Sequence, residues 1–114
     1  MLLIQAEAYA RKNDLTNAVA QLNRVRAKTA VQDAFGLGAG LPAYTGANTA
    51  DAILLDIYKN RLIELAFQGF RLEDSRRFNR PGAGAVGSER NRNFFPYPRT
   101  ERDNNSNTPA DPAL

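Results

Sequence analysis

Residues 2–26, LLIQAEAYARKNDLTNAVAQLNRVR, decide the fold of this chain. Apolar residues recur at helical spacing on both sides of a break at residues 12–14. Asp14 can cap a second helix, because its carboxylate can accept hydrogen bonds from the free amides of the first turn. Asn13 tolerates the left-handed conformation that a tight turn requires. The pattern therefore predicts a helical hairpin over residues 1–29.

Small residues are expected where the two helices of this hairpin meet. Ala6 and Tyr9 lie on the first helix, and Ala18 follows on the second at the spacing of a tetratricopeptide repeat. Such small side chains allow two helices to approach closely. The hairpin therefore has a tetratricopeptide-like pattern, although the chain contains no second full copy of it.

A second helical unit is predicted over residues 49–78. Asn48 or Thr49 can cap its first helix, which is expected to run to residue 67 and to end or kink at Gly69. A wide apolar stripe predicts burial on more than one side; it comprises Ile53, Leu54, Ile57, Tyr58, Leu62, Ile63, Leu65, Ala66 and Phe67. A shorter helical piece follows over residues 70–78.

The remaining segments are expected to be irregular. Glycine and proline place a loop at residues 30–48, and a glycine- and arginine-rich loop at residues 79–93. Prolines make residues 94–98 extended, and residues 99–114 show no helical or strand period. The predicted fold is therefore all-α: one domain over residues 1–114, with tetratricopeptide-like hairpins, long irregular loops, and a loop and extended tail from residue 79 onward.

Composition excludes several kinds of chemistry. The chain contains no cysteine and no histidine, so it offers no thiol nucleophile, no serine–histidine pair and no histidine-bound zinc. The net charge is +3, and the charges are interleaved rather than gathered into the basic stripe of a nucleic-acid binder. No segment reaches the roughly 20 apolar residues that span a bilayer. The sequence also shows no signal peptide and no cysteine for a lipid anchor. No cofactor is expected.

The densest group of charged residues comprises Arg61, Glu64, Arg71 and Asp74. Their three-residue spacings allow ion pairs on a helix, and large apolar neighbours predict that the group is largely buried. We interpret it as a structural network that holds the helix bend. A glycosidase pair of Glu64 and Asp74 is the disfavoured alternative, because nearby arginines would keep both carboxyls ionised. We therefore expect Asp74→Ala to be strongly destabilising and Glu89→Ala to have little effect.

Several aromatic residues are candidates for contact with a ligand. Phe35 and Tyr44 lie in the glycine-rich loop rather than on an apolar stripe, which favours them as ligand contacts. Aromatic residues at positions 94, 95 and 97 could stack on sugar rings, although packing onto the helices is the favoured role. The asparagine-rich tail lacks the spacing of a calcium loop. No metal site or catalytic residue is predicted.

Three separated segments together resemble the SusD/RagB family. They are residues 2–26, residues 61–77 (RLIELAFQGFRLEDSRR) and residues 95–107 (FPYPRTERDNNSN). Their order and content match the family pattern over most of the chain. Gln68 stands where the family has a glutamate, Leu72-Glu73 where it has an aromatic pair, and Ser75 where it has a leucine. These departures are expected to weaken packing after the bend.

The resemblance implies an oligosaccharide-binding surface lipoprotein of a Bacteroidetes-type outer-membrane nutrient importer. It implies a TonB-dependent transporter as partner, and no enzymatic activity. Family members are longer and carry a lipid anchor, so we expect this chain to be a C-terminal fragment containing the helical scaffold. Two other classes stay open. One is a tetratricopeptide-like protein-interaction module without glycan binding, and the other is a small glycosidase that depends on Glu64.

Overall fold

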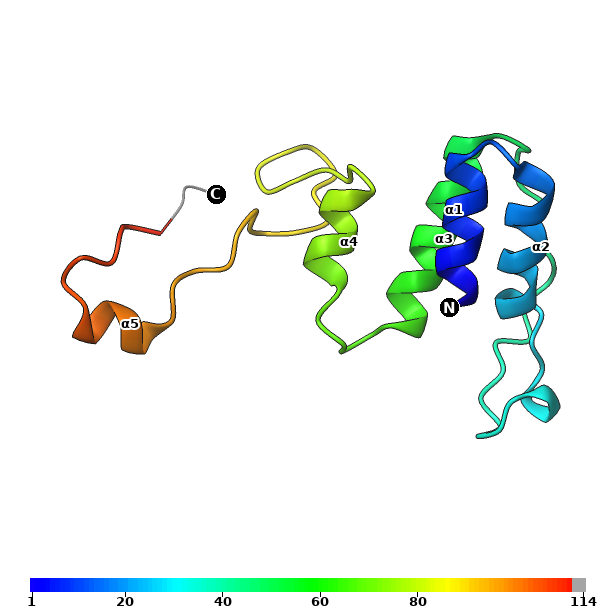
Figure 1. Cartoon of the computed structure of the whole chain (residues 1–114), viewed down its shortest axis with the longest axis horizontal. Coiled ribbons are helices and arrows are strands. Elements are labelled where there is room, and N and C mark those ends of the chain that lie inside the picture. Colours follow the sequence, from blue (N-terminus) through cyan, green and yellow to red (C-terminus); the bar gives the residue numbers. More distant parts are fainter. Residues whose placement is uncertain (112–114) are drawn as a thin grey trace. The chain divides into compact units, whose positions relative to one another are not determined.

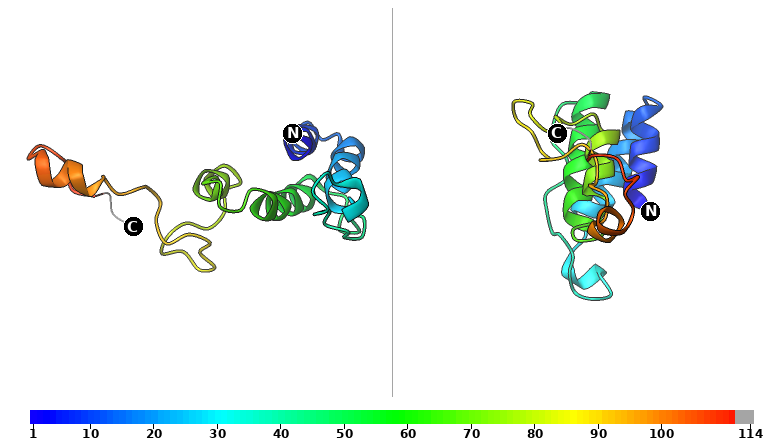
Figure 2. Two further views of the ribbon diagram at one scale, coloured as in Figure 1. Left: turned by 90° about the horizontal axis from the view of Figure 1, so that it is seen from below. Right: turned by 90° about the vertical axis from the view of Figure 1, so that its left-hand side faces the viewer.

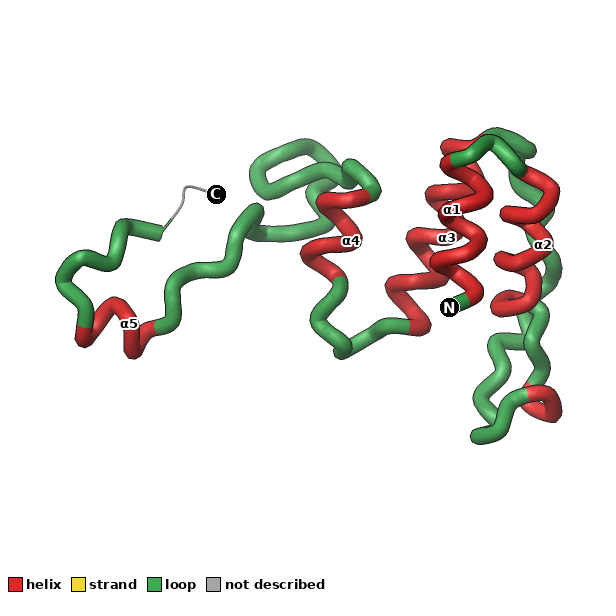
Figure 3. Tube along the Cα trace, in the orientation of Figure 1, coloured by secondary structure: helices red, strands yellow, loops and turns green. Residues whose placement is uncertain are grey.

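A computed structural model describes residues 1–111. Over these residues the chain forms helices joined by loops, with no strand (Figure 3). The predicted all-α class is therefore confirmed. The chain divides into two compact units, one comprising Met1–Phe70 and the other beginning at Arg71, and each is described by itself. No helix in the described part is both long and apolar enough to cross a membrane.

The first unit opens with the predicted helical hairpin. Helix α1 comprises Leu2–Arg11 and helix α2 comprises Leu15–Arg26. Asn13 adopts a left-handed conformation, with φ 61°, and the Asp14 carboxylate accepts hydrogen bonds from the backbone and side-chain nitrogens of Asn17 at 3.3 and 2.8 Å. The turn and the cap are therefore confirmed.

Helix α3, Ala50–Glu64, packs against both helices of the hairpin, and the three lie side by side (Figures 1 and 2). The Thr49 hydroxyl caps α3 by accepting a hydrogen bond from the Ala52 amide at 3.4 Å. Each helix contributes buried apolar residues to the core between them, which comprises Leu3, Ala6, Ala10, Ala18, Leu22, Ile53, Ile57 and Tyr58. Alanines at the hairpin contact are fully buried, as the close approach of two helices requires.

Helix α3 ends three residues earlier than predicted. Glu64 is its last residue, and Leu65 closes it with a hydrogen bond to the Arg61 carbonyl. Phe67 and Gly69 then adopt left-handed conformations, with φ 65° and 80°. A left-handed residue cannot continue a right-handed helix, so the apolar pattern through residue 67 does not extend α3. The predicted break at Gly69 is thus part of a longer non-helical connection.

The second unit contains two short helices. Helix α4, Arg71–Arg77, matches the predicted helical piece to within one residue at each end. Helix α5, Arg99–Asn104, contradicts the prediction that residues 99–114 lack helix. Its bonds are local: Asn104 donates to the Thr100 carbonyl at 2.8 Å, and its side chains show no apolar period. A helix held in this way gives no periodic signal in the sequence.

The loop after α2 and the predicted second helical unit both differ in detail from the sequence-based expectation. The loop at residues 30–48 contains one 3-10 turn, Ala30–Gln32, which the sequence did not predict. The grouping of residues 49–78 into one helical unit stays a prediction, because α3 and α4 lie in separate compact units.

Candidate functional site

The segment that follows α2 is a loop organised around Asp33. One carboxylate oxygen of Asp33 accepts hydrogen bonds from the amides of Phe35 and Leu37 at 3.0 and 3.1 Å. Its other oxygen binds the Lys28 ammonium group. This bond from Lys28 is the main reason that the pKa of Asp33 lies below its ordinary value, and the two amides lower the pKa further. Asp33 thus ties the tip of the loop to the end of α2.

Backbone contacts close the base of the same loop. The amides of Gly40 and Leu41 donate to the carbonyls of Lys28 and Arg26, each at 2.8 Å. Gly38 lies so close to the chain at Thr29 that a Cβ there would approach the Thr29 carbonyl carbon to 2.2 Å. Residues 28–41, which we call the braced loop, therefore have a defined conformation without an apolar core of their own.

The two ligand candidates from the sequence have different surroundings. Phe35 is 85% exposed at the tip of the braced loop. Tyr44 is half-buried: its amide donates to the Asn23 side chain at 2.7 Å and its hydroxyl donates to the Ala47 carbonyl at 2.8 Å. Burial raises the pKa of Tyr44. Tyr44 is therefore bonded within the segment that leads into α3. The Phe35 side chain, in contrast, makes little contact with its own chain.

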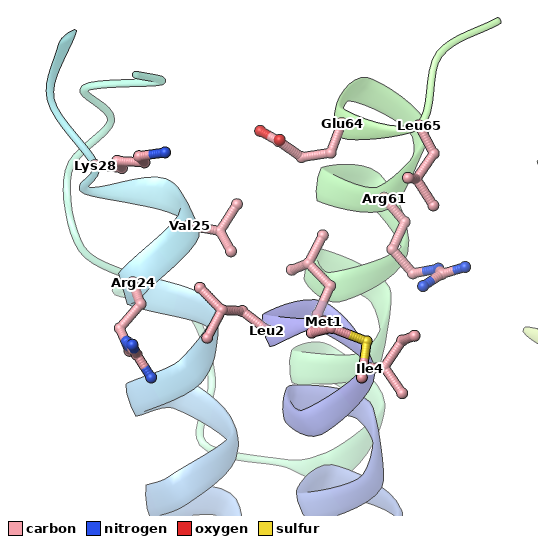
Figure 4. Close-up of a pocket in the computed structure, with 10 residues that line it drawn as sticks. Met1, Leu2, Ile4, Arg24, Val25, Lys28, Arg61, Glu64 and Leu65 are labelled. Atoms are coloured by element: carbon pink, nitrogen blue, oxygen red, sulfur yellow. The ribbon is translucent and has the colours of Figure 1, made fainter. Parts of the chain in front are cut away.

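A hollow of about 310 Å³ lies between the start of α1 and the ends of α2 and α3 (Figure 4). Most of its lining is apolar, with four charged side chains at its margin; the lining residues are Met1, Leu2, Leu3, Ile4, Arg24, Val25, Lys28, Arg61, Glu64 and Leu65. Figure 4 shows Glu64 and Val25 directed toward the space between α2 and α3. A second hollow of about 420 Å³ shares Leu2, Arg24 and Lys28 with it.

The first hollow can bind a neutral ligand that has both apolar faces and hydroxyl groups. Its aliphatic floor provides apolar contact, while a guanidinium, an ammonium and a carboxylate can hydrogen-bond hydroxyls. The Arg24 guanidinium donates to the Gln21 side chain, one turn earlier on α2, at 3.0 Å. Glu64 is the only carboxylate among the lining residues, so the hollow does not supply the two carboxyl groups that glycoside hydrolysis uses.

The four residues of the predicted ion-pair network differ in exposure. Arg61 and Asp74 are buried, whereas Glu64 and Arg71 are exposed. Asp74 accepts a bond from Arg77 at 2.9 Å, and Arg71 donates to the Glu89 carbonyl at 3.3 Å. Arg61 and Glu64 belong to the first unit, while Arg71 and Asp74 belong to the second. A single network of all four residues stays a prediction.

The loop at residues 79–93 is held by arginines that the sequence did not single out. The Arg90 guanidinium donates to the Ser75 hydroxyl at 3.1 Å, to the Arg80 carbonyl at 2.9 Å and to the Asn93 side chain at 3.2 Å. Ser75 is fully buried and itself donates to the Leu72 carbonyl at 2.9 Å. Ser75, which stands where the family pattern has a leucine, is thus buried and hydrogen-bonded, and the expected weakening of packing stays a prediction.

Glu89 belongs to the same network. Its carboxylate accepts two bonds from the Arg80 guanidinium, at 2.7 and 2.5 Å, and both side chains are partly buried. The structure therefore pairs Glu89 with Arg80, and the small effect of Glu89→Ala stays a prediction. The sequence did not reveal this ion pair, because Arg80 and Glu89 lie nine residues apart in a loop, where no helical spacing applies.

The aromatic segment and the tail complete the second unit. Phe94, Phe95 and Tyr97 are all exposed, and the Arg76 guanidinium lies 5.5 Å from the centre of the Phe94 ring. In the tail, Asp111 accepts bonds from the Tyr97 amide at 3.1 Å and from Arg102 at 3.0 Å. Within residues 1–111, no group of three or more acidic side chains is placed to hold a metal ion.

Comparison with known proteins identifies the family. The model of the SusD family matches residues 1–112, and the chain therefore belongs to this family. No curated protein and no solved structure matches the chain. The family match covers the hairpin, the three-helix core and the second unit alike, which agrees with the three separated segments on which the resemblance rests.

Proposed function

We propose that this chain, as a member of the SusD family, is part of an outer-membrane lipoprotein that binds oligosaccharides at the cell surface and passes them to a TonB-dependent transporter. The match of the family model over residues 1–112 is the observation that carries the proposal. Within the protein, the chain provides a tetratricopeptide-like scaffold, and its role is binding rather than catalysis.

The hollow at the start of α1 is the ligand contact that we assign to this chain. It combines an aliphatic floor with Arg24, Lys28 and Glu64 at its margin. Sugars present the same combination, because their C–H faces are apolar and their edges carry hydroxyl groups. Ligand contacts by Phe35 and Tyr44 remain predictions from the sequence.

A glycan array on the full protein tests the proposal. We expect at least one polysaccharide to bind without being cleaved. Arg24→Ala combined with Glu64→Ala should weaken that binding by about tenfold or more, because a hydrogen bond to a charged group contributes about 1.5–3 kcal/mol. Lys12→Ala is the control, since Lys12 is exposed and follows the opposite end of α1. Unchanged binding in the double variant would show that the ligand does not contact this hollow.

A protein-interaction module without glycan binding is the second candidate function. The tetratricopeptide-like packing of α1, α2 and α3 favours it. Absence of glycan binding on the array, together with retained binding to a protein partner, would decide for this alternative. Hydrolysis that disappears in Glu64→Gln would instead identify a glycosidase.

A further inference from the structure

The second hollow, beside the end of α2, differs from the first in the chemistry of its lining. Its volume is about 420 Å³, and its lining residues are Leu2, Asn23, Arg24, Ala27, Lys28 and Gln32. Among these described residues there are two cations and no carboxylate, whereas Glu64 lies at the margin of the first hollow. The two hollows adjoin, since both are lined by Leu2, Arg24 and Lys28 (Figure 4).

Both amide side chains of the second hollow use their oxygen atoms within the protein. The Asn23 oxygen accepts a hydrogen bond from the Tyr44 amide at 2.7 Å. The Gln32 oxygen accepts from the amide and the hydroxyl of Thr29, at 3.0 and 3.2 Å. An amide side chain whose oxygen is bonded in this way offers a ligand its N–H groups. Asn23 and Gln32 therefore provide this hollow mainly with hydrogen-bond donors.

The two cations add only further donors. A guanidinium has five N–H donors and an ammonium has three, and neither group accepts a hydrogen bond. Arg24 donates to the Gln21 side chain at 3.0 Å, and Lys28 donates to Asp33. Each bond uses one donor, so both cations can also bind a ligand. Because Asp33 offsets the charge of Lys28, the net positive charge of this hollow comes from Arg24.

A lining made of donors favours a ligand that only accepts hydrogen bonds. Sugar hydroxyl groups both donate and accept, so a neutral sugar would leave its own donors without partners in the second hollow. A carboxylate or a sulfate has only acceptor oxygens, and its charge suits the fork of a guanidinium. The first hollow, in contrast, combines cations with the Glu64 carboxylate and can hold a neutral sugar.

We infer that the second hollow binds the acidic group of an oligosaccharide, a carboxylate or a sulfate, while the neighbouring sugar occupies the first hollow. Arg24 binds the anionic oxygens, and the N–H groups of Lys28 and Gln32 complete the site. This acidic-sugar site rests on the proposed function and narrows its substrate class, from oligosaccharides in general to those that carry an acidic group.

Two matched pairs of polysaccharides test the acidic-sugar site on the full protein. One pair is polygalacturonate and its methyl ester, which differ in carboxylate charge. The other pair is a sulfated galactan and its desulfated form. We expect the charged member of at least one pair to bind about tenfold more tightly than its neutral partner, and its affinity to fall as sodium chloride is added. The pair that shows this difference identifies the acidic group.

Gln32→Glu distinguishes this site from a general attraction between a polyanion and a basic protein. The glutamate oxygens can still accept bonds from Thr29, so the loop keeps its bracing, but an anionic oxygen replaces the N–H donors. We expect the charged polysaccharide to bind about tenfold more weakly or worse. Arg24→Gln, at an exposed position of α2, should weaken binding to a similar extent, by about tenfold.

Gln68→Glu is the matched control for Gln32→Glu. Gln68 is exposed and lines neither hollow, so this variant adds the same charge at another place. It should leave the affinity for the charged polysaccharide unchanged. All three variants should retain the thermal stability of the parent, because none of them alters a buried side chain.

Three outcomes overturn the inference. Binding of neutral polysaccharides alone, or equal affinities within both pairs, would show that the second hollow takes no acidic group, while the proposed function stands. Equal losses in Gln32→Glu and Gln68→Glu would show that overall charge, rather than this hollow, attracts the polyanion. If no polysaccharide binds to the full protein at all, the proposed function fails, and the acidic-sugar site fails with it.

Discussion

The two compact units of this chain are held together by different kinds of contact. In residues 1–70, three helices enclose an apolar core in which Leu22, Ile53 and Ile57 are fully buried. In residues 71–111, the buried residues are Asp74 and Ser75, and no large apolar side chain is buried. The first unit is thus held by apolar burial, and the second by directional bonds from arginines.

This difference determines how each unit responds to substitution. Apolar burial is non-directional and scales with the area removed from water, so damage to the first unit should follow the volume removed. A charged hydrogen bond depends on one particular partner, and its loss leaves the other group unsatisfied. In the second unit, even a change of charge at constant shape should therefore matter.

The largest expected loss of stability comes from a buried isoleucine of α3, and an exposed isoleucine of the same helix is its control. Ile57 is 0% exposed and Ile63 is 69% exposed. Ile57→Ala should lower the free energy of unfolding by about 2–5 kcal/mol because it leaves a cavity in the core. Ile63→Ala should change the free energy by less than about 1 kcal/mol. Urea unfolding followed by the helical circular dichroism signal measures both. Equal effects would mean that the helices do not pack as described.

Neighbouring carboxylates on α4 give the next contrast. Asp74 is buried and bonded to Arg77, whereas Glu73 is exposed and pairs with Arg76 at 3.3 Å. We expect Asp74→Ala to destabilise the second unit by about 1–3 kcal/mol, and Glu73→Ala by about 0–1 kcal/mol. Hydrogen exchange at the Phe78 amide, which bonds to the Asp74 carbonyl, reports the difference. A larger effect from Glu73→Ala would contradict the conclusion that the buried bond between Asp74 and Arg77 stabilises the second unit.

The smallest expected effect concerns pH at the braced loop. Because the folded pKa of Asp33 is lowered, its contribution is present above the unfolded pKa of about 3.9 and is lost as pH falls through the lower folded value. The amide chemical shifts of Phe35 and Leu37 should therefore be constant from about pH 7 to 5 and change below about pH 4. Asp33→Asn should abolish that change. If the chemical shifts still change below about pH 4 in this variant, a group other than Asp33 causes the change.

The sequence predicted the features that depend on local spacing. The caps at Asp14 and Thr49, the left-handed Asn13 and the small residues at the hairpin contact all have short-range signals, and the structure shows each of them. The end of α3 was predicted too late, because the apolar pattern continues through residues that turn left-handed.

The missed features depend on contacts between distant residues or on side-chain bonds alone. The bond from Arg90 to Ser75 spans fifteen residues, and the role of Asp33 depends on how the loop folds back. Neither leaves a periodic pattern in the sequence. The hollow at the start of α1 brings together residues from three helices, so helix packing had to be known before it could be found. Helix α5 was missed because local polar bonds, rather than an apolar stripe, hold it.

Hydrogen exchange of Glu89→Gln tests most directly whether charged bonds hold the second unit. The substitution keeps the shape of the side chain and removes the charge that binds Arg80. Charge-assisted hydrogen bonds are about twice as strong as neutral ones, so exchange at the Ala83 and Glu89 positions should accelerate by about tenfold, which corresponds to about 1.4 kcal/mol. Protection of α1, α2 and α3 should not change. Unchanged exchange throughout residues 79–93 would contradict the account, because the loop would then be held by something other than its ion pair.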